Sequence, residues 1–290
     1  MVSNKSDRLS TEQIALTSKY LAEMTERFAS PIAAVQPLFG RCCLATLPSS
    51  IPCWDTLTRE VAWVAAGILS HPDPASLSLD PLPIIEIYTM IKGIDREVPE
   101  MRQILERVGP DLEAQPPEIR STGRVRQIAS TLSKLGFPNQ VASPTKETKN
   151  LLNEKESWFS APASKLSDLA DHLIADDVPL DETDTKILSL IALGELRNYH
   201  LDIGCKLLRT VLQLGVPGEE TRDGVDFIAL QRRRDGRYGF LDRLAEKPEQ
   251  TADPDTTLFL PMTLNAAWLF KTEAACVVML PVLTTVGETA

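Results

Sequence analysis

Two stretches of the chain carry side chains whose types and spacing could do chemistry. His200 and Cys205, with Tyr199 beside them, lie at the joint between two predicted helices, and the carboxyl groups of Asp253 and Asp255 stand just before the last predicted helix. The imidazole of His200 could act as a general base, because histidine changes its charge near neutral pH. A zinc site at His200 and Cys205 would need two further ligands. Ordinary packing within the helix joint also accounts for both residues.

The stretch before the acidic pair has the pattern of a helix end followed by a tight turn. Gly224, Phe227 and Gln231 lie in the last turns of a predicted amphipathic helix. Gly236 then supplies a left-handed stop, and Tyr238 follows two residues later. This spacing resembles the QW repeat of the α/α-toroid proteins, with Tyr238 in place of the usual tryptophan. In such a motif the glutamine amide satisfies loose backbone groups and stacks under the ring.

The α/α-toroid family includes the squalene-hopene-type terpenoid cyclases and the β-subunits of protein prenyltransferases. In its class II cyclases an Asp-x-Asp-Asp-Thr motif supplies the acid that starts cyclisation. Residues 253–257 resemble this motif, with Thr256 where the third aspartate would stand. The resemblance implies that Asp255 is the proton donor and Asp253 its partner, which keeps the acid protonated beside an apolar wall. The alternative is an acidic loop that caps the following helix.

Other metal or cofactor chemistry of the family finds little support. Asp176, Asp177 and Asp181 resemble the metal-binding acidic run of class I terpene synthases, but Pro179 interrupts the helix that would align them. Helix capping explains these residues better. The zinc ligands of the prenyltransferases do not occur at matching spacing. We therefore predict neither a metal nor a cofactor.

The composition limits the classes of function. The chain has 290 residues, 43% of them hydrophobic, which is enough for a sizeable core. Aromatic residues make up 6%, a low share for a cyclase that surrounds carbocations with rings. The net charge of −10 disfavours binding to nucleic acid or anionic membranes. Five cysteines without CxxC spacing, no visible signal peptide and no apolar stretch long enough to span a bilayer indicate a soluble protein of the cytoplasm.

The elements that must position these residues are predicted to be helices throughout. A capping pattern begins the first helix at Ser10, and Asp181 is a natural N-cap of a later helix. We expect irregular structure over residues 31–53 and a flexible excursion over residues 139–162. The predicted helices cover residues 10–28, 55–69, 84–94, 97–108, 118–135, 164–174, 183–197 and 201–214, one ending at the motif, and a last one from 261.

The arrangement of these helices suggests one domain over residues 1–290. Residues 79–95 and the helix after them resemble the helix pair that begins near Asp181, and recurring pairs suit a toroid or solenoid. We therefore predict an all-α protein with helical hairpins in a single α/α-barrel or partial toroid. Trp63 and Trp268 fall on apolar helical faces and are expected in the core or in a cavity wall. Tyr199 and His200 could face the same cavity and contact a substrate.

Two functions follow from this reading. Residues 181–270 also resemble small toroid-related proteins of bacterial natural-product gene clusters. One prediction is therefore a biosynthetic protein with a terpenoid-cyclase-like fold that performs acid-initiated cyclisation of an apolar isoprenoid or polyene. The alternative is a non-catalytic helical protein that holds a peptide or a partner enzyme in a tailoring pathway. The ligand is an apolar small molecule or a peptide in either case, and the oligomeric state is left open.

Overall fold

The protein is all-α, as the sequence predicts. The structure is a computed structural model that describes residues 8–71, 80–137, 139, 155–239 and 255–284, without the side chains of 155, 156 and 277–284. The described residues form helices and no strand, with one isolated antiparallel bridge between Arg232 and Tyr238. In this part of the chain no helix combines the length and apolar character that a membrane span needs.

The contacts divide the chain into two compact units. Unit 1 consists of Met1–Tyr20, Cys43–Pro52 and Asp181–Ala290, and unit 2 of Leu21–Cys42 and Cys53–Leu180. The helices α1 (Thr11–Arg27) and α2 (Pro31–Ala45) each contribute residues to both units. The expected single domain and its barrel or toroid arrangement stay predictions, and each unit is described by itself below.

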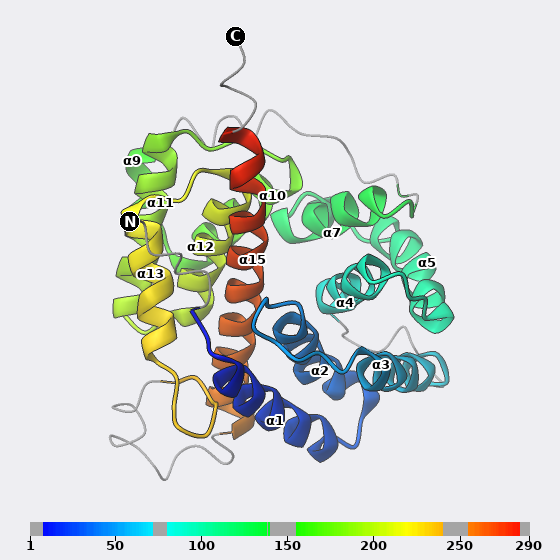
Figure 1. Ribbon diagram of the computed structural model, residues 1–290. Coiled ribbons are helices and arrows are strands. Elements are labelled where there is room, and N and C mark those ends of the chain that lie inside the picture. Colours follow the sequence, from blue (N-terminus) through cyan, green and yellow to red (C-terminus); the bar gives the residue numbers. More distant parts are fainter. Residues whose placement is uncertain (1–7, 72–79, 138, 140–154, 240–254, 285–290) are drawn as a thin grey trace. The chain divides into compact units, whose positions relative to one another are not determined.

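Unit 1 is built around α12 (Leu201–Leu214). This helix packs against α11 (Glu182–Arg197), α13 (Glu219–Leu230) and α15 (Leu260–Thr284), which follows the short π-helix η2 (Asp255–Phe259) (Figure 1). Helices on several sides bury most of α12, and Asp202, Lys206 and Gln213 form the one polar stripe that this packing leaves outside. Gly204 and Gly224 permit close helix packing around α12: a Cβ at Gly204 would meet Leu196, and one at Gly224 would lie 2.9 Å from Leu208.

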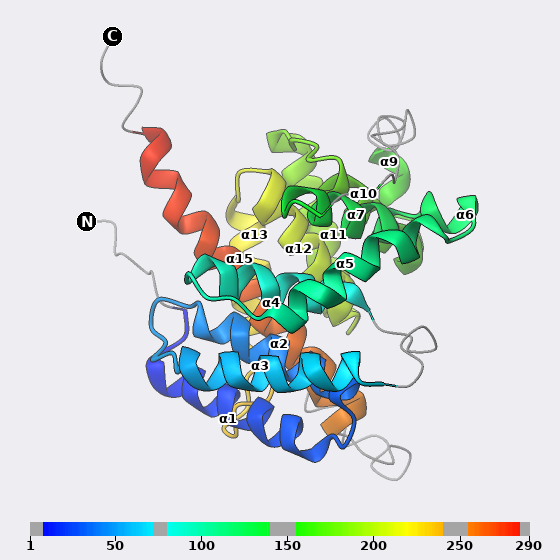
Figure 2. The ribbon, with the colours of Figure 1, turned by 90° about the vertical axis from the view of Figure 1, so that its right-hand side faces the viewer.

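Unit 2 is a set of helices around α5. The helix α5 (Pro99–Glu113) contacts α3 (Trp54–Leu69), α4 (Pro81–Gly93) and α7 (Gly123–Lys134) (Figure 2). The short α6 (Pro117–Arg120) precedes α7, and α10 (Ala163–Ala175) packs along α7. The four-residue helix α9 (Lys155–Trp158) completes the described elements of this unit.

The predicted helix caps are confirmed. The backbone N–H of Ser10 donates to Gln13 Oε1 at 2.8 Å, and the backbone N–H of Gln13 donates back to Ser10 Oγ at 3.2 Å. Asp181 accepts at Oδ1 from the backbone N–H of Asp184 at 2.7 Å. These bonds satisfy N–H groups that a helix start leaves without partners, so local sequence alone identifies both helix starts.

The prediction that residues 31–53 are irregular is wrong for most of that range, because α2 covers Pro31–Ala45. Pro31 stands in the first turn, where a missing N–H costs little. Pro37 removes one hydrogen bond inside the helix. Ala34, Val35, Leu38 and Phe39 are all buried, and their burial offsets this cost.

Proline also misled the prediction for α5. A break was expected at Gly109-Pro110, but the helix continues through Pro110 to Glu113. Burial of Gly109 and Leu112 explains the continuation, since apolar burial can outweigh the one hydrogen bond that proline removes.

The predicted helix over 118–135 is in fact two helices, α6 and α7. The last helical segment begins at Asp255, before the predicted position 261. Most of the expected excursion 139–162 lies outside the described residues.

Candidate binding groove

Of the predicted acid pair, the structure describes only Asp255, and this residue is ion-paired. Asp253 lies outside the described residues. Asp255 is the first residue of η2, and Arg237 Nη1 donates to its Oδ1 at 2.5 Å. Hydrogen bonds with Asp235 first, and then with Asp255, raise the pKa of Arg237 above its usual range despite partial burial. The carboxylate that the acid prediction needs for a substrate is therefore engaged in an ion pair with Arg237.

The predicted chemical pair His200 and Cys205 does not come together. His200 is exposed at the start of α12, and its Nδ1 lies 2.7 Å from Glu195 Oε2. Cys205 is buried within unit 1, and burial raises the pKa of its thiol to about 12. Tyr199 has a left-handed backbone (φ 66°) and is 39% exposed in the turn between α11 and α12. The expected substrate contacts of Tyr199 and His200 therefore lie at an exposed turn.

The two tryptophans have different surroundings. Trp63 is 58% exposed, so its expected place in the core is wrong. The buried face of α3 carries Leu57, Val61, Val64 and Ile68, and Trp63 points away from that face. Trp268 lies under the guanidinium of Arg209, whose Cζ is 3.3 Å from the ring centroid. The stacking joins α12 to α15 inside unit 1.

The aspartates of the supposed metal run have other partners. Asp176 forms an ion pair with Arg126 and Asp177 one with Lys134, and Asp181 caps α11. The described residues contain no group of three or more potential ligands that could hold a metal ion. These aspartates therefore act in ion pairs and as a helix cap.

The motif residues form a hairpin, residues 231–239, that is held by unit 1. Gly236 has a φ of 87°, and a Cβ there would lie 2.5 Å from Leu16 C. Thr17 Oγ1 donates to the Gly236 carbonyl at 2.8 Å. The Tyr238 ring is buried against Phe270, with the centroids 5.9 Å apart. These contacts attach the hairpin to α1 and α15.

The side chain of Gln231 has a smaller role in the hairpin than the motif implies. Its Nε2 donates to the Phe227 carbonyl of its own helix at 3.3 Å, whereas its backbone carbonyl accepts from the Gly239 N–H at 3.2 Å. The backbone N–H of Tyr238 donates to Thr263 Oγ1 at 3.1 Å. The backbone of the hairpin and the side chains of other residues therefore make the bonds that fix it, and the Gln231 side chain makes none of them.

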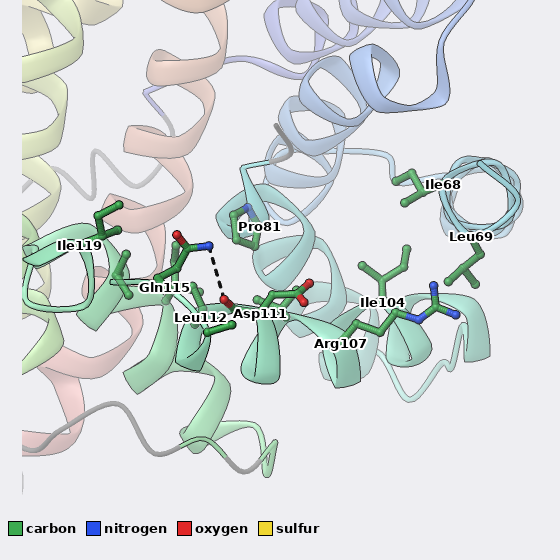
Figure 3. A pocket seen from close by; sticks show the side chains of 13 residues that line it. Ile68, Leu69, Pro81, Ile104, Arg107, Asp111, Leu112, Gln115 and Ile119 are labelled. Carbon is green, nitrogen blue, oxygen red and sulfur yellow. Dashed lines mark hydrogen bonds between the residues drawn. The ribbon is translucent and has the colours of Figure 1, made fainter. Parts of the chain in front are cut away.

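A groove in unit 2 has the features of a binding site. Its volume is about 470 Å³, within the range usual for ligand pockets. Figure 3 shows its lining spread along α5, with Ile68, Leu69, Ile104 and Arg107 towards one end and Gln115 and Ile119 towards the other. The full lining is Ile68, Leu69, Pro81, Ile104, Arg107, Val108, Asp111, Leu112, Ala114, Gln115, Ile119, Val125 and Ile128.

The helix α5 contributes two kinds of side chain to this groove. Ile104, Val108 and Leu112 follow one another at four-residue intervals and form an apolar row. Arg107 and Asp111 have the same spacing, and Gln115 continues this polar row just past the helix end. Gln115 Nε2 contacts the Asp111 carbonyl at 3.5 Å (Figure 3). A ligand in the groove would thus meet an aliphatic floor and a polar rim.

The opposite wall of the groove depends on how α7 is held. Val125 and Ile128 line the groove from α7, and Arg126 between them points into a buried polar cluster with α10. Arg126 forms an ion pair with Asp176, and its Nη1 lies 2.9 Å from His172 Nδ1. Since a guanidinium only donates, His172 Nδ1 accepts this bond. The polar cluster therefore fixes the turn of α7 that presents Val125 and Ile128.

Gly123 allows this packing of α7 on α10. A Cβ at Gly123 would lie 2.5 Å from the Asp168 carbonyl oxygen and 2.9 Å from the backbone nitrogen of His172. The Gly123 N–H donates to Asp168 Oδ1 at 2.8 Å. No residue with a side chain fits here without a shift of one of the two helices.

The sequence contained one signal for the groove. The alternating apolar and polar rows of α5 are visible at helical spacing once the helix is allowed to pass Pro110. Because the helix was expected to end there, Asp111, Leu112 and Gln115 were not assigned to it. The lining residues of α3 and α4 are distant from α5 in sequence and those of α6 and α7 follow it, but only the packing brings them all to one groove.

Comparisons of the chain with known protein families, with curated proteins and with solved structures find no match.

Proposed function

We propose that this protein is a binding protein whose groove along α5 receives an amphipathic helix of a partner. The observation that carries the proposal is the pairing of an aliphatic row with a polar row, both at four-residue spacing, along one groove. A partner helix repeats its own side chains at the same interval of about 6 Å. Helix-in-groove recognition uses aliphatic anchors at such intervals.

The size of the groove decides how such a helix would bind. A helix with its side chains is about 10–12 Å wide, too wide to enter a groove of about 470 Å³ as a whole. The partner would therefore insert one row of aliphatic side chains and keep its body outside. Burial of such side chains contributes roughly 1.5–3 kcal/mol each, enough for several anchors to give stable binding after the cost of association.

Acid-initiated cyclisation is the weaker candidate. It requires a protonated carboxyl group at an apolar cavity, whereas Asp255 is ion-paired with Arg237 in the described residues. The groove offers aliphatic side chains and a rim of arginine, aspartate and glutamine, which can bind and orient a partner. A role in a natural-product pathway stays a prediction that rests on the sequence resemblance.

The test is a selection of helical peptides by the full chain. The library carries aliphatic residues at helical positions i, i+3, i+4 and i+7 and helix-forming residues elsewhere. We expect the enriched peptides to bind Ile119→Glu at least about fivefold more weakly, because desolvating a new carboxylate costs on the order of 1–3 kcal/mol. Ile119 lines the groove and is already 45% exposed, so this variant should fold.

The matched control is Trp63→Glu, at another exposed residue of unit 2 that does not line the groove. It should leave peptide affinity unchanged, and circular dichroism would check the fold of both variants. The proposal would be refuted if the enriched peptides bound Ile119→Glu as tightly as the wild-type chain, or if no peptide were enriched. If dodecanol binds in an Ile119-dependent manner and no peptide does, the groove is a site for small apolar molecules instead.

A further inference from the structure

The rim of the groove carries two opposite charges that are not paired with each other. Arg107 and Asp111 lie four residues apart on α5, the spacing at which helical ion pairs form. Neither forms an ion pair within the described part of the chain. Both side chains are exposed, and both line the groove.

The same helix contains a pair for comparison. Arg102 and Glu106 have the same spacing and the same order of charges, and Arg102 Nε donates to Glu106 Oε1 at 3.0 Å. Neither lines the groove. The helix α5 therefore forms an ion pair outside the groove, between Arg102 and Glu106. At the rim Arg107 and Asp111 form none with any described residue, so a bound partner can reach both charges.

We infer that Arg107 and Asp111 select the charge pattern of the bound helix. This inference rests on the proposed function. The complementary partner carries one acidic and one basic side chain four residues apart, the acidic one at Arg107 and the basic one at Asp111. Their separation of about 6 Å along the axis matches that of the two rim residues. Gln115 offers a donor and an acceptor and adds no charge preference.

Like-charged partners would be rejected at one position each. A helix with two acidic residues would meet Arg107 favourably and Asp111 unfavourably, and a helix with two basic residues the reverse. Exposed ion pairs are individually weak, so each matched or mismatched charge should change the dissociation constant by about two- to fivefold. Added salt should reduce the differences, because it screens exposed charges.

The experiment uses three synthetic peptides with one aliphatic row and two variable positions four residues apart beside it. These positions hold Glu and Lys, two Glu, or two Lys. We expect the wild-type chain to bind the mixed peptide best, in fluorescence anisotropy titrations. Arg107→Asp should bind the Lys-Lys peptide best, and Asp111→Arg the Glu-Glu peptide.

The control is Arg102→Asp, which changes charge equally on α5 but away from the groove, and it should keep the wild-type ranking. If all three peptides bind alike and still depend on Ile119, the groove binds helices but the rim does not select charge, and only this inference fails. If none of them binds, the proposed function fails as well. If Arg102→Asp changes the ranking of the three peptides as much as Arg107→Asp does, the effect comes from net charge alone. That result would refute the role of the rim.

Discussion

The hairpin 231–239 of unit 1 and the groove of unit 2 use similar residues in opposite ways. In the hairpin, Arg237 is bound by Asp235 and Asp255, and the Tyr238 ring is buried against Phe270. In the groove, Arg107 and Asp111 stand open beside an aliphatic floor. The charged side chains therefore hold the fold together in the first region, and in the second region they stay open to a partner.

The difference lies in whether the fold itself satisfies the side chains. A side chain whose partners belong to the same unit already interacts within the fold. A ligand could bind that side chain only if those contacts broke. A side chain that lines a concave, apolar surface without such partners can bind a ligand at little structural cost. The hairpin has the more recognisable sequence, yet the groove has the better site.

The largest expected effect is at Tyr238. If the hairpin is structural, Tyr238→Ala should destabilise the protein by about 3–5 kcal/mol, as for other buried aromatic side chains. Urea unfolding followed by circular dichroism would measure it. The control is Tyr238→Phe: the buried hydroxyl has no hydrogen-bond partner among the described residues, so its removal should be neutral or stabilising. A large loss with phenylalanine would show that the hydroxyl has a function.

A smaller effect is expected at Gly123, which sets the wall of the groove. Gly123→Ala places a methyl group against the backbone of α10, and such overpacking costs about 1–3 kcal/mol. Peptide binding should weaken with stability, because Val125 and Ile128 move with α7. Gly93→Ala is the matched control, since a Cβ there meets nothing within 4 Å. Unchanged thermal unfolding and unchanged binding in Gly123→Ala would contradict this account of the groove.

The smallest effect is expected at Gln231. Its side chain is half-buried and makes one hydrogen bond of 3.3 Å to its own helix, so Gln231→Ala should cost no more than about 1 kcal/mol. Thermal unfolding measured beside the Tyr238 variants would place the two residues on one scale. A loss of stability above about 2 kcal/mol would show that the Gln231 side chain has the central role that the QW-like motif implies.

Much of the fold could be predicted because its signals are local. Helical periodicity, the capping bonds at Ser10 and Asp181, and the left-handed Gly236 all depend on residues close in sequence. The two proline errors fell where burial overrode a local preference, because Pro37 and Pro110 stand inside helices that bury apolar residues. The error at Trp63 is the opposite, since this apolar ring faces solvent. Local sequence rules give the average structural preference of a proline or a tryptophan. They do not include the tertiary neighbours that the residue contacts in a particular fold.

The sequence by itself determined that the chain is helical and where most helices lie. Only the tertiary structure decided that Asp255 meets Arg237, that Arg126 fixes α7 on α10, and that Ile68, Ile119 and Val125 line one groove with α5. Secondary structure follows from interactions a few residues apart. A binding site depends on which distant surfaces pack together and which side chains that packing leaves without a partner.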